Sequence, residues 1–154
     1  MSEHPPIGVD LGTTYSLIAC FEEGGARVLR DLGGSALLPS AVALDDGGRL
    51  LVGAPARDRW LAGKPGSAMR FKPEMGGAKR FDFGGSAWTP TALSALVLRE
   101  LRERASRALA VDVTDVVLTV PAWFREPQRR ATLDAAVLAG LRVRRLLNEP
   151  TAAA

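Results

Sequence analysis

The order of strands and helices that the sequence predicts is that of an α/β protein with a mixed sheet flanked by helices. Two short apolar runs, 7–10 and 15–22, follow each other around a Gly-Thr-Thr corner, which is typical of paired strands. Later in the chain, two helical patterns alternate with two apolar strand patterns. The 154 residues are enough for one domain with its own hydrophobic core.

Short strands and turns dominate the first half of the chain. We expect a third strand at 26–31, after the turn signal Glu23-Gly24-Gly25. The stretch 38–53 indicates a hairpin with Asp-Asp-Gly-Gly as its turn, and a short helix follows at 54–61. The polar, Gly- and Pro-rich stretch 63–85 has no clear period, so we expect it to be the least regular part of the chain.

The second half begins with a long helix. Thr89 and Pro90 form a strong helix start, with a threonine as N-cap and a proline at the first helical position. The apolar residues that follow at helical spacing are Leu93, Leu96, Val97, Leu101, Ala105 and Ala108. The continuous apolar run at 115–120 indicates a strand covered on both faces, which Pro121 ends.

A second helix is predicted at 126–139, ended by Gly140, and a last strand at 141–147. We expect a loop at 148–150 and the first turn of another helix at 151–154. Because a fold rarely stops one turn into a helix, we expect the chain to be the first part of a longer domain.

The composition, 47% apolar and 24% charged, is that of an ordinary soluble globular protein. No stretch approaches the roughly 20 apolar residues of a membrane span, and the N-terminus lacks the pattern of a signal peptide. The lone Cys20 lies in an apolar run, which favours a small buried hydrophobe. These features predict a cytoplasmic protein with no membrane partner.

The net charge of +3 does not by itself indicate nucleic-acid binding. The segment 99–107 mixes both signs along a predicted helix, which is typical of a solvated face. The basic run 142–145 is short, and Val143 interrupts it. We therefore expect no nucleic-acid partner.

The segment GVDLGTTYS, residues 8–16, carries the strongest chemical signal. A corner whose backbone N–H groups converge can hold a phosphate; Gly12 permits backbone angles that a Cβ would forbid, and Thr13 and Thr14 add hydroxyl donors. Asp10, at the end of the first strand, would repel a polyphosphate unless a cation intervenes, so it predicts Mg²⁺ held through its waters. The alternative is a plain β-turn with a solvated aspartate. The corner matches neither the Walker nor the dinucleotide-binding pattern.

Two more side chains are candidates for phosphate chemistry. Lys72 is one of only three lysines in a chain with 17 arginines, and it lies on no amphipathic face. It either neutralises charge on a γ-phosphate or is an ordinary surface lysine. Glu149 follows the last strand and either orients an attacking water or is an acid that favours a helix N-terminus. We predict no role for His4 and packing roles for the three tryptophans.

Four motifs occur in the order in which one family has them: IGVDLGTTYS, LLPSAVAL, DVVLTVPAWF with QRRAT, and RLLNEPTAAA. They resemble the ATP-binding domain of DnaK-like chaperones, the seventy-kilodalton heat-shock family. The abbreviated stretch 71–98 looks most like the short bacterial members of the HscC type. The resemblance implies an actin-like, ribonuclease H-like ATPase fold with two lobes. Residues 1–154 are then the first lobe, with a reduced upper subdomain inserted at about 38–90; the second lobe and the peptide-binding domain are expected to be absent.

The resemblance also implies roles for individual residues. The residues implied to bind the nucleotide phosphates are Gly12, Thr13, Thr14 and Tyr15. Those implied to be catalytic are Lys72, Glu149 and Asp10, of which Asp10 also belongs to the Mg²⁺ and K⁺ environment. Those implied to relay the nucleotide state to the peptide-binding domain are Pro121 and Arg129. Those implied to contact J-domain co-chaperones and the interdomain linker are Arg145 and Asn148.

The implied function is ATP binding and hydrolysis in a chaperone motor that assists protein folding, with ATP or ADP, Mg²⁺ and K⁺ as cofactors. Its partners would be a J-domain co-chaperone and, through the absent domain, unfolded client peptides; the chain alone is expected to hydrolyse ATP negligibly. Two departures matter. Pro73 stands where the family usually has a basic residue, and the segment between Lys72 and Thr89 is short, which disfavours a GrpE-type exchange factor.

Three alternatives stay open at this point. A bacterial actin-like filament protein shares the corner and a Glu-Pro-x-Ala-Ala-Ala segment, but Tyr15, the run 120–124 and Asn148 favour the chaperone. A sugar or acetate kinase shares the corner and does not explain NEPTAAA. A non-catalytic remnant that only binds partners would have the same fold.

Overall fold

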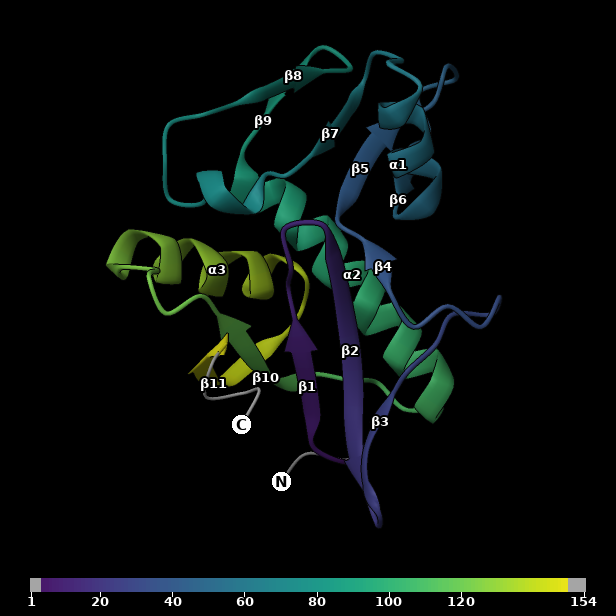
Figure 1. Cartoon of the computed structure of the whole chain (residues 1–154), viewed down its shortest axis with the longest axis vertical. Helices are drawn as coiled ribbons and strands as arrows, with labels where there is room; N and C mark the ends of the chain where they lie inside the picture. The colour runs from purple at the N-terminus through teal and green to yellow at the C-terminus, as the bar shows by residue number, and fades with distance from the viewer. Residues whose placement is uncertain (1–3, 150–154) are drawn as a thin grey trace.

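The structure is a computed structural model that describes residues 4–149, and its largest sheet has six strands (Figure 1). These strands are β1 (Ile7–Asp10), β2 (Tyr15–Glu22), β3 (Gly25–Val28), β4 (Leu38–Pro39), β10 (Asp115–Val120) and β11 (Arg142–Asn148). Their order is β11–β10–β1–β2–β3, and β4 pairs with β2. β1 and β2 are antiparallel, whereas β10 is parallel to both β1 and β11, so the predicted mixed sheet is confirmed.

The parallel strands bring the candidate residues to one edge of the sheet. Asp10 is the last residue of β1 and is in register with Thr119 of β10, which in turn is in register with Leu147 of β11. Because parallel strands run in the same direction, the carboxyl ends of β1, β10 and β11 lie at the same edge, and the arrows of β1 and β10 both point upward in Figure 1.

A second group of short elements lies above this sheet in Figure 1. It contains β5 (Ala41–Leu44), β6 (Leu50–Val52), α1 (Ala54–Leu61), β7 (Ser67–Met69), the 3₁₀ turn η1 (Lys72–Glu74), β8 (Phe81–Phe83) and β9 (Ser86–Trp88). β5 is central in a sheet with β6 and β7, and β8 pairs with β9. The hairpin at 38–53 and the helix at 54–61 are thus confirmed.

The expectation that 63–85 is the least regular part of the chain is wrong. This stretch contributes a strand to the three-stranded sheet, the 3₁₀ turn and one strand of the β8–β9 hairpin. Its strands are only three residues long, too short for an alternating pattern to stand out. The glycines that flank these strands, such as Gly66 directly before β7 and Gly84 directly after β8, have positive φ angles and change the direction of the chain there.

Two long helices, α2 (Pro90–Leu109) and α3 (Glu126–Leu138), pack against each other and against the sheet. The predicted start of α2 is confirmed, because the Thr89 side chain accepts a hydrogen bond from the Ala92 N–H. Side chains of α2 such as Leu98 and Leu101 are fully buried in the core. The other face of the sheet is less covered: Val117 and Thr119 are half-buried, so the prediction that β10 is covered on both faces is wrong for the described residues.

The predicted boundaries of three elements shift. β3 is Gly25–Val28 rather than 26–31, α3 ends one residue early, at Leu138, and β11 is Arg142–Asn148 rather than 141–147. Asn148 belongs to the strand because it is in register with Val120 of β10. The predicted helix turn at 151–154 lies outside the described residues.

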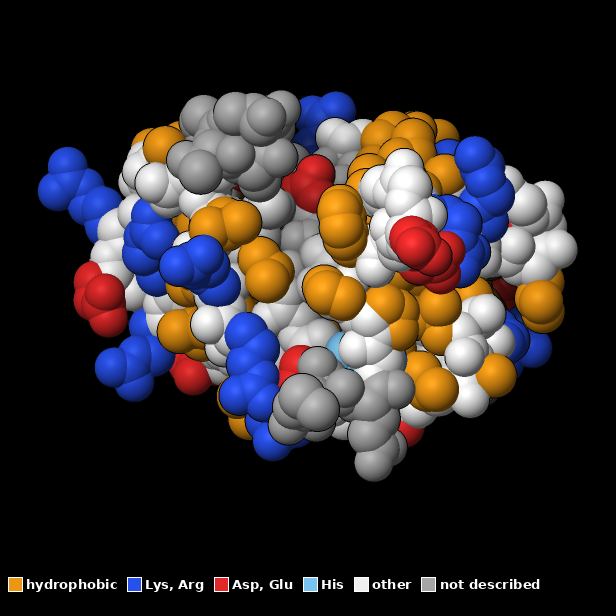
Figure 2. Space-filling view, turned by 90° about the horizontal axis from the view of Figure 1, so that it is seen from below, with side chains coloured by type: hydrophobic (Ala, Val, Ile, Leu, Met, Phe, Trp, Pro, Cys, Tyr) orange, Lys and Arg blue, Asp and Glu red, His pale blue; other side chains and the backbone are white. Residues whose placement is uncertain are grey.

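The remaining packing predictions are confirmed in part. Cys20 is buried, and burial raises the pKa of its thiol. Trp88 packs against the core and stacks on Phe83, but Trp60 is 39% and Trp123 61% exposed, so a packing role is wrong for these two residues. Basic and acidic side chains both appear on the face seen in Figure 2. No helix among the described residues is long and apolar enough to cross a membrane.

His4 has a structural role that the sequence did not predict. Its ring is buried, and Nε2 accepts hydrogen bonds from the N–H groups of Thr114 (3.2 Å) and Asp115 (3.3 Å). The other ring nitrogen, Nδ1, lies 2.8 Å from the Pro5 carbonyl, to which it donates. His4 therefore fastens the segment before β1 to the start of β10.

Asp115 is a buried carboxylate whose charge is balanced by two arginines of β11. Its Oδ1 lies 3.1 Å from Arg142 Nε and 2.8 Å from Arg144 Nε. Arg144 is the extra residue at a β-bulge, where Val116 pairs with Val143 and the next pair is Val117 with Arg145. Burial alone would raise the pKa of Asp115, but the close ion pair with Arg144 and the charges of both arginines lower it below the ordinary value of 3.8.

We expect Asp115→Asn to lower the melting temperature at neutral pH, and we expect this difference to disappear in acid. Because the folded-state pKa is lowered, the stabilisation is fully present above about pH 4 and is lost as the pH falls through the folded-state pKa. Thermal melts should therefore give different melting temperatures for wild type and variant at pH 7 and similar melting temperatures in strong acid. Asp112→Asn, which removes an exposed partner of Arg102, should have a smaller effect. Equal melting temperatures of wild type and Asp115→Asn at pH 7 would contradict the account.

Candidate functional site

The corner between β1 and β2 is packed too tightly for a side chain at Gly12. A Cβ built there would overlap the carbonyl oxygen of Tyr15. Gly12 does not have a positive φ, so the expected reason for glycine, an unusual backbone angle, is wrong; the reason is close backbone approach. Within residues 4–149, no protein acceptor bonds the N–H of Thr13 or Thr14. These two N–H groups are therefore free to bind a ligand.

Asp10 lies at the carboxyl end of β1, half-buried, and is oriented by a residue that the sequence analysis missed. Thr119 Oγ1 donates a 2.9 Å hydrogen bond to Asp10 Oδ1 across the parallel pair of strands. A single threonine inside the apolar run 115–120 was the available signal, because a hydroxyl within such a strand needs a partner. The bond occupies one carboxylate oxygen, and the site keeps the other oxygen for a cation or its waters.

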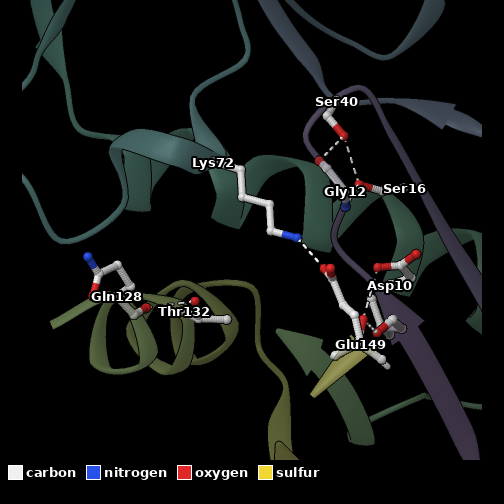
Figure 3. Close-up of polar contacts among 10 residues, drawn as sticks. Asp10, Gly12, Ser16, Ser40, Lys72, Gln128, Thr132 and Glu149 are labelled. Atoms are coloured by element: carbon white, nitrogen blue, oxygen red, sulfur yellow. Dashed lines mark hydrogen bonds and ion pairs between the residues drawn. The ribbon is translucent and has the colours of Figure 1, made fainter. Parts of the chain in front are cut away.

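Lys72 and Glu149, 77 positions apart in the sequence, meet beside this corner (Figure 3). Lys72 is buried, and its Nζ lies 2.7 Å from Glu149 Oε1. The Phe124 ring lies 5.9 Å from the same ammonium, within the range of a cation–π contact. Lys72 begins the 3₁₀ turn η1, and Pro73 fits at the second position of that turn. The turn and the phenylalanine hold the ammonium at the edge of the sheet.

Arg129 of α3 connects the turn after β10 to the end of β11. Its Nε donates to the Phe124 carbonyl (3.1 Å), and one terminal nitrogen donates to Asn148 Oδ1 (2.6 Å). Phe124 in turn donates its N–H to the Pro121 carbonyl (3.0 Å). The structure thus brings Pro121, Arg129 and Asn148 into one hydrogen-bonded chain that ends one residue before Glu149.

Two predicted site residues lie apart from this group. Arg145 is exposed on β11, in register with Val117. The Tyr15 side chain is 42% exposed and lines a different pocket, of about 390 Å³, together with Arg57 and Arg104. The structure therefore brings only the backbone of Tyr15, and not its ring, to the corner.

A cavity of about 380 Å³ extends along the less covered face of the sheet from the candidate site. Asp10, Thr119 and Glu149 line one part of it, and the rest is mostly apolar, with Leu17 and Val117 among the lining residues. The described residues contain no cluster of three or more His, Cys, Asp or Glu side chains that could hold a metal. A cation at this site would thus have few protein ligands. Mg²⁺ suits such a site, because in proteins it usually keeps several of its water ligands.

Comparisons with known proteins agree with this geometry. The family described as "Hsp70 protein" matches at residues 6–82 and 77–154, which together cover nearly the whole chain. The chain belongs to the Hsp70 family. The chaperone protein DnaK of Elusimicrobium minutum and that of Picrophilus torridus are each 43% identical to it over 152 residues. In each comparison the aligned region covers 96% of this chain and 25% of the relative.

Membership of the Hsp70 family confirms the actin-like ATPase fold, of which the mixed sheet and its helices are a part. It supports the chaperone motor over the filament protein and the sugar or acetate kinase. This Hsp70 chain spans about a quarter of the length of the curated relatives that it matches.

Proposed function

We propose that this chain is part of the ATP-binding and ATP-hydrolysing motor domain of a DnaK-like chaperone. The observation that carries the proposal is the meeting of Lys72, Glu149 and Asp10 at the edge of the sheet beside the free N–H groups of the corner. A buried ammonium, two carboxylates and free backbone donors at the carboxyl ends of strands suit a polyphosphate with a divalent cation.

The residues fit the groups that the family implies. Backbone N–H groups of Thr13 and Thr14 have no protein acceptor among the described residues and suit phosphate oxygens. Asp10 offers the hard oxygen ligand that Mg²⁺ prefers, directly or through water. Mg²⁺, when bound, would neutralise phosphate charge. K⁺ would be held by the same kind of oxygen donors.

The chain's own residues then have distinct tasks. The corner orients the phosphates through its backbone, and Lys72 supplies a positive charge to a terminal phosphate. Glu149 holds a water by hydrogen bonding and accepts a proton from it. Lys72 and Glu149 are bonded to each other through one of the three donors of the ammonium. We expect Lys72 to turn toward a phosphate when one binds, which leaves more of the Glu149 carboxylate for a water.

Further parts of the proposal follow from the family. Residues 38–90 form a reduced upper subdomain, because β5, β6 and β7 make a sheet separate from the large one. The chain of bonds from Pro121 through Arg129 to Asn148 relays the state of the site, and Arg145 with Asn148 contacts a J-domain co-chaperone. Client peptides would be bound outside these 154 residues, and we predict that the protein acts in the cytoplasm.

Calorimetric titration of the purified chain tests the proposed function. We expect Mg·ATP and Mg·ADP to bind with a dissociation constant below about 1 mM. Adenosine, which lacks phosphate, should bind far more weakly, and EDTA should abolish most of the ATP affinity. Equal affinity for adenosine and Mg·ATP would contradict a site built around phosphate.

We expect negligible ATP hydrolysis by the 154-residue chain itself. Phosphoryl transfer needs positioning and charge stabilisation from both sides of the phosphates, and the candidate residues supply one side. Release of inorganic phosphate, measured against a two-lobed DnaK, is the assay. Turnover at the rate of DnaK, lost on Lys72→Ala, would contradict this prediction.

Thr119→Val should weaken Mg·ATP binding about fivefold, since a hydrogen bond of roughly 1 kcal/mol that orients Asp10 is removed. The matched control is Thr132→Val, which removes a buried threonine hydroxyl that bonds the Gln128 carbonyl within α3 (Figure 3). Titration calorimetry at fixed Mg²⁺ compares the two variants. If both weaken binding equally, Asp10 orientation is not the cause.

A further inference from the structure

Two buried serines that the proposed function does not use form a closed circuit of hydrogen bonds with Gly12. The Gly12 N–H donates to Ser16 Oγ (3.1 Å), the two serine hydroxyls lie 2.8 Å apart, and Ser40 Oγ donates to the Gly12 carbonyl (2.8 Å). Both serines are 1% exposed. Because the single hydroxyl proton of Ser40 goes to Gly12, Ser16 must be the donor between the serines. Figure 3 shows this circuit beside Lys72.

The circuit fixes the backbone of the corner through hydrogen bonds to protein groups. It satisfies both polar backbone groups of Gly12, and the Ser40 N–H also donates to the Thr14 carbonyl (2.9 Å). Residues 12 and 14 are therefore fixed from the protein side, while the N–H groups of Thr13 and Thr14 stay free of protein acceptors in the described chain. A backbone fixed in advance loses less conformational entropy when it binds a phosphate.

Ser40 also occupies a junction between the two groups of strands. It is the single residue between β4, which pairs with β2 of the large sheet, and β5, the centre of the small sheet. β7 pairs with β5, with Ala41 in register with Met69, three residues before Lys72. The same small sheet thus supports Ser40 and leads to the candidate lysine.

We propose that Ser16 and Ser40 are positioning residues of the phosphate corner, with Ser40 linking the corner to the sheet that leads to Lys72. This inference rests on the proposed function for its ligand. The circuit itself needs no ligand, because all of its bonds join protein atoms to one another. Removal of either hydroxyl opens the whole circuit, so the two serines act as one unit.

The first measurement is amide hydrogen exchange by NMR on the ligand-free chain. We expect Ser40→Ala to speed exchange at the Gly12 N–H about tenfold, although Ser40 does not touch that group, because the circuit that orders Ser16 is open. The matched control, Ser106→Ala, removes a serine hydroxyl that accepts from the Val113 N–H, far along the chain. This control variant should leave the exchange rate of the Gly12 N–H unchanged. Unaltered exchange at Gly12 in Ser40→Ala would overturn the proposal.

The second measurement is the affinity for Mg·ADP of Ser16→Ala, Ser40→Ala and the double variant, well below their melting temperatures. Ser16→Ala and Ser40→Ala should each weaken binding about tenfold, and the double variant should lose about as much as either alone. Wild-type affinity in Ser40→Ala, or fully additive losses, would overturn the positioning role. If the wild type binds no Mg·ADP, the proposed function fails for this chain, and the exchange data still decide whether the circuit holds the corner.

Discussion

Gly12→Ala is expected to weaken Mg·ATP binding by about 10- to 100-fold, because relief of the overlap costs roughly 1–3 kcal/mol. The added methyl group would overlap the Tyr15 carbonyl oxygen, a backbone atom that cannot rotate away on its own. The corner must open to accept it, and the free N–H groups of Thr13 and Thr14 then lose their common orientation. Titration calorimetry with Mg·ATP measures the loss.

Gly33→Ala is the matched control for this substitution. Gly33 lies in an exposed loop, has no positive φ, and a Cβ there would meet only the Asp31 carboxylate at 3.4 Å, an ordinary contact. We expect wild-type affinity for Mg·ATP in this variant. If Gly12→Ala also binds Mg·ATP as the wild type does, the corner does not hold the phosphates.

Substitutions of the two members of the ion pair beside the corner should differ in their effects on Mg·ATP affinity. Lys72→Ala removes a buried positive charge, and we expect it to weaken Mg·ATP binding about 10- to 100-fold, the value of a charge-assisted hydrogen bond. Glu149→Gln removes a carboxylate that competes with phosphate for Lys72. We expect this variant to bind Mg·ATP as tightly as the wild type or more tightly.

The same segment offers a matched ion pair for control. Lys79 and Glu74 lie 3.7 Å apart and both side chains are partly exposed, so Lys79→Ala and Glu74→Gln change the same charges in an ion pair that includes neither Lys72 nor Glu149. These variants should change Mg·ATP affinity little, and the small change should shrink further as the ionic strength rises. The account of Lys72 is refuted if Lys72→Ala and Lys79→Ala have the same effect.

Strong local signals made most of the fold predictable. Thr89 and Pro90 fix the start of α2 by capping chemistry, and the apolar runs of β1, β2 and β10 were found at their observed bounds. The small strands β7 to β9 were missed because each has three residues and is defined by its pairing partner rather than by its own pattern. Pairing also extended β11 to Asn148.

The candidate site was predicted in part, and the missing part depends on contacts between distant segments. Asp10 and the corner were visible because one short segment contains them. The bond between Lys72 and Glu149, and that of Thr119 with Asp10, join residues 77 and 109 positions apart, so no local pattern encodes them. Ser16 and Ser40 resemble any strand serine in the sequence; only their burial and mutual distance single them out. The role of His4 likewise depends on the hydrogen bonds that it accepts from Thr114 and Asp115, which lie far away in the sequence.

A crystal structure of this chain grown with Mg·ADP is the most direct test of the central claim, that the corner and Lys72 form a phosphate site. The account predicts phosphate oxygens within hydrogen-bonding distance of the Thr13 and Thr14 N–H groups, Mg²⁺ density on the Asp10 side, and Lys72 Nζ turned from Glu149 toward the phosphates. Nucleotide density elsewhere, with the Lys72–Glu149 ion pair intact and the corner unoccupied, would contradict it.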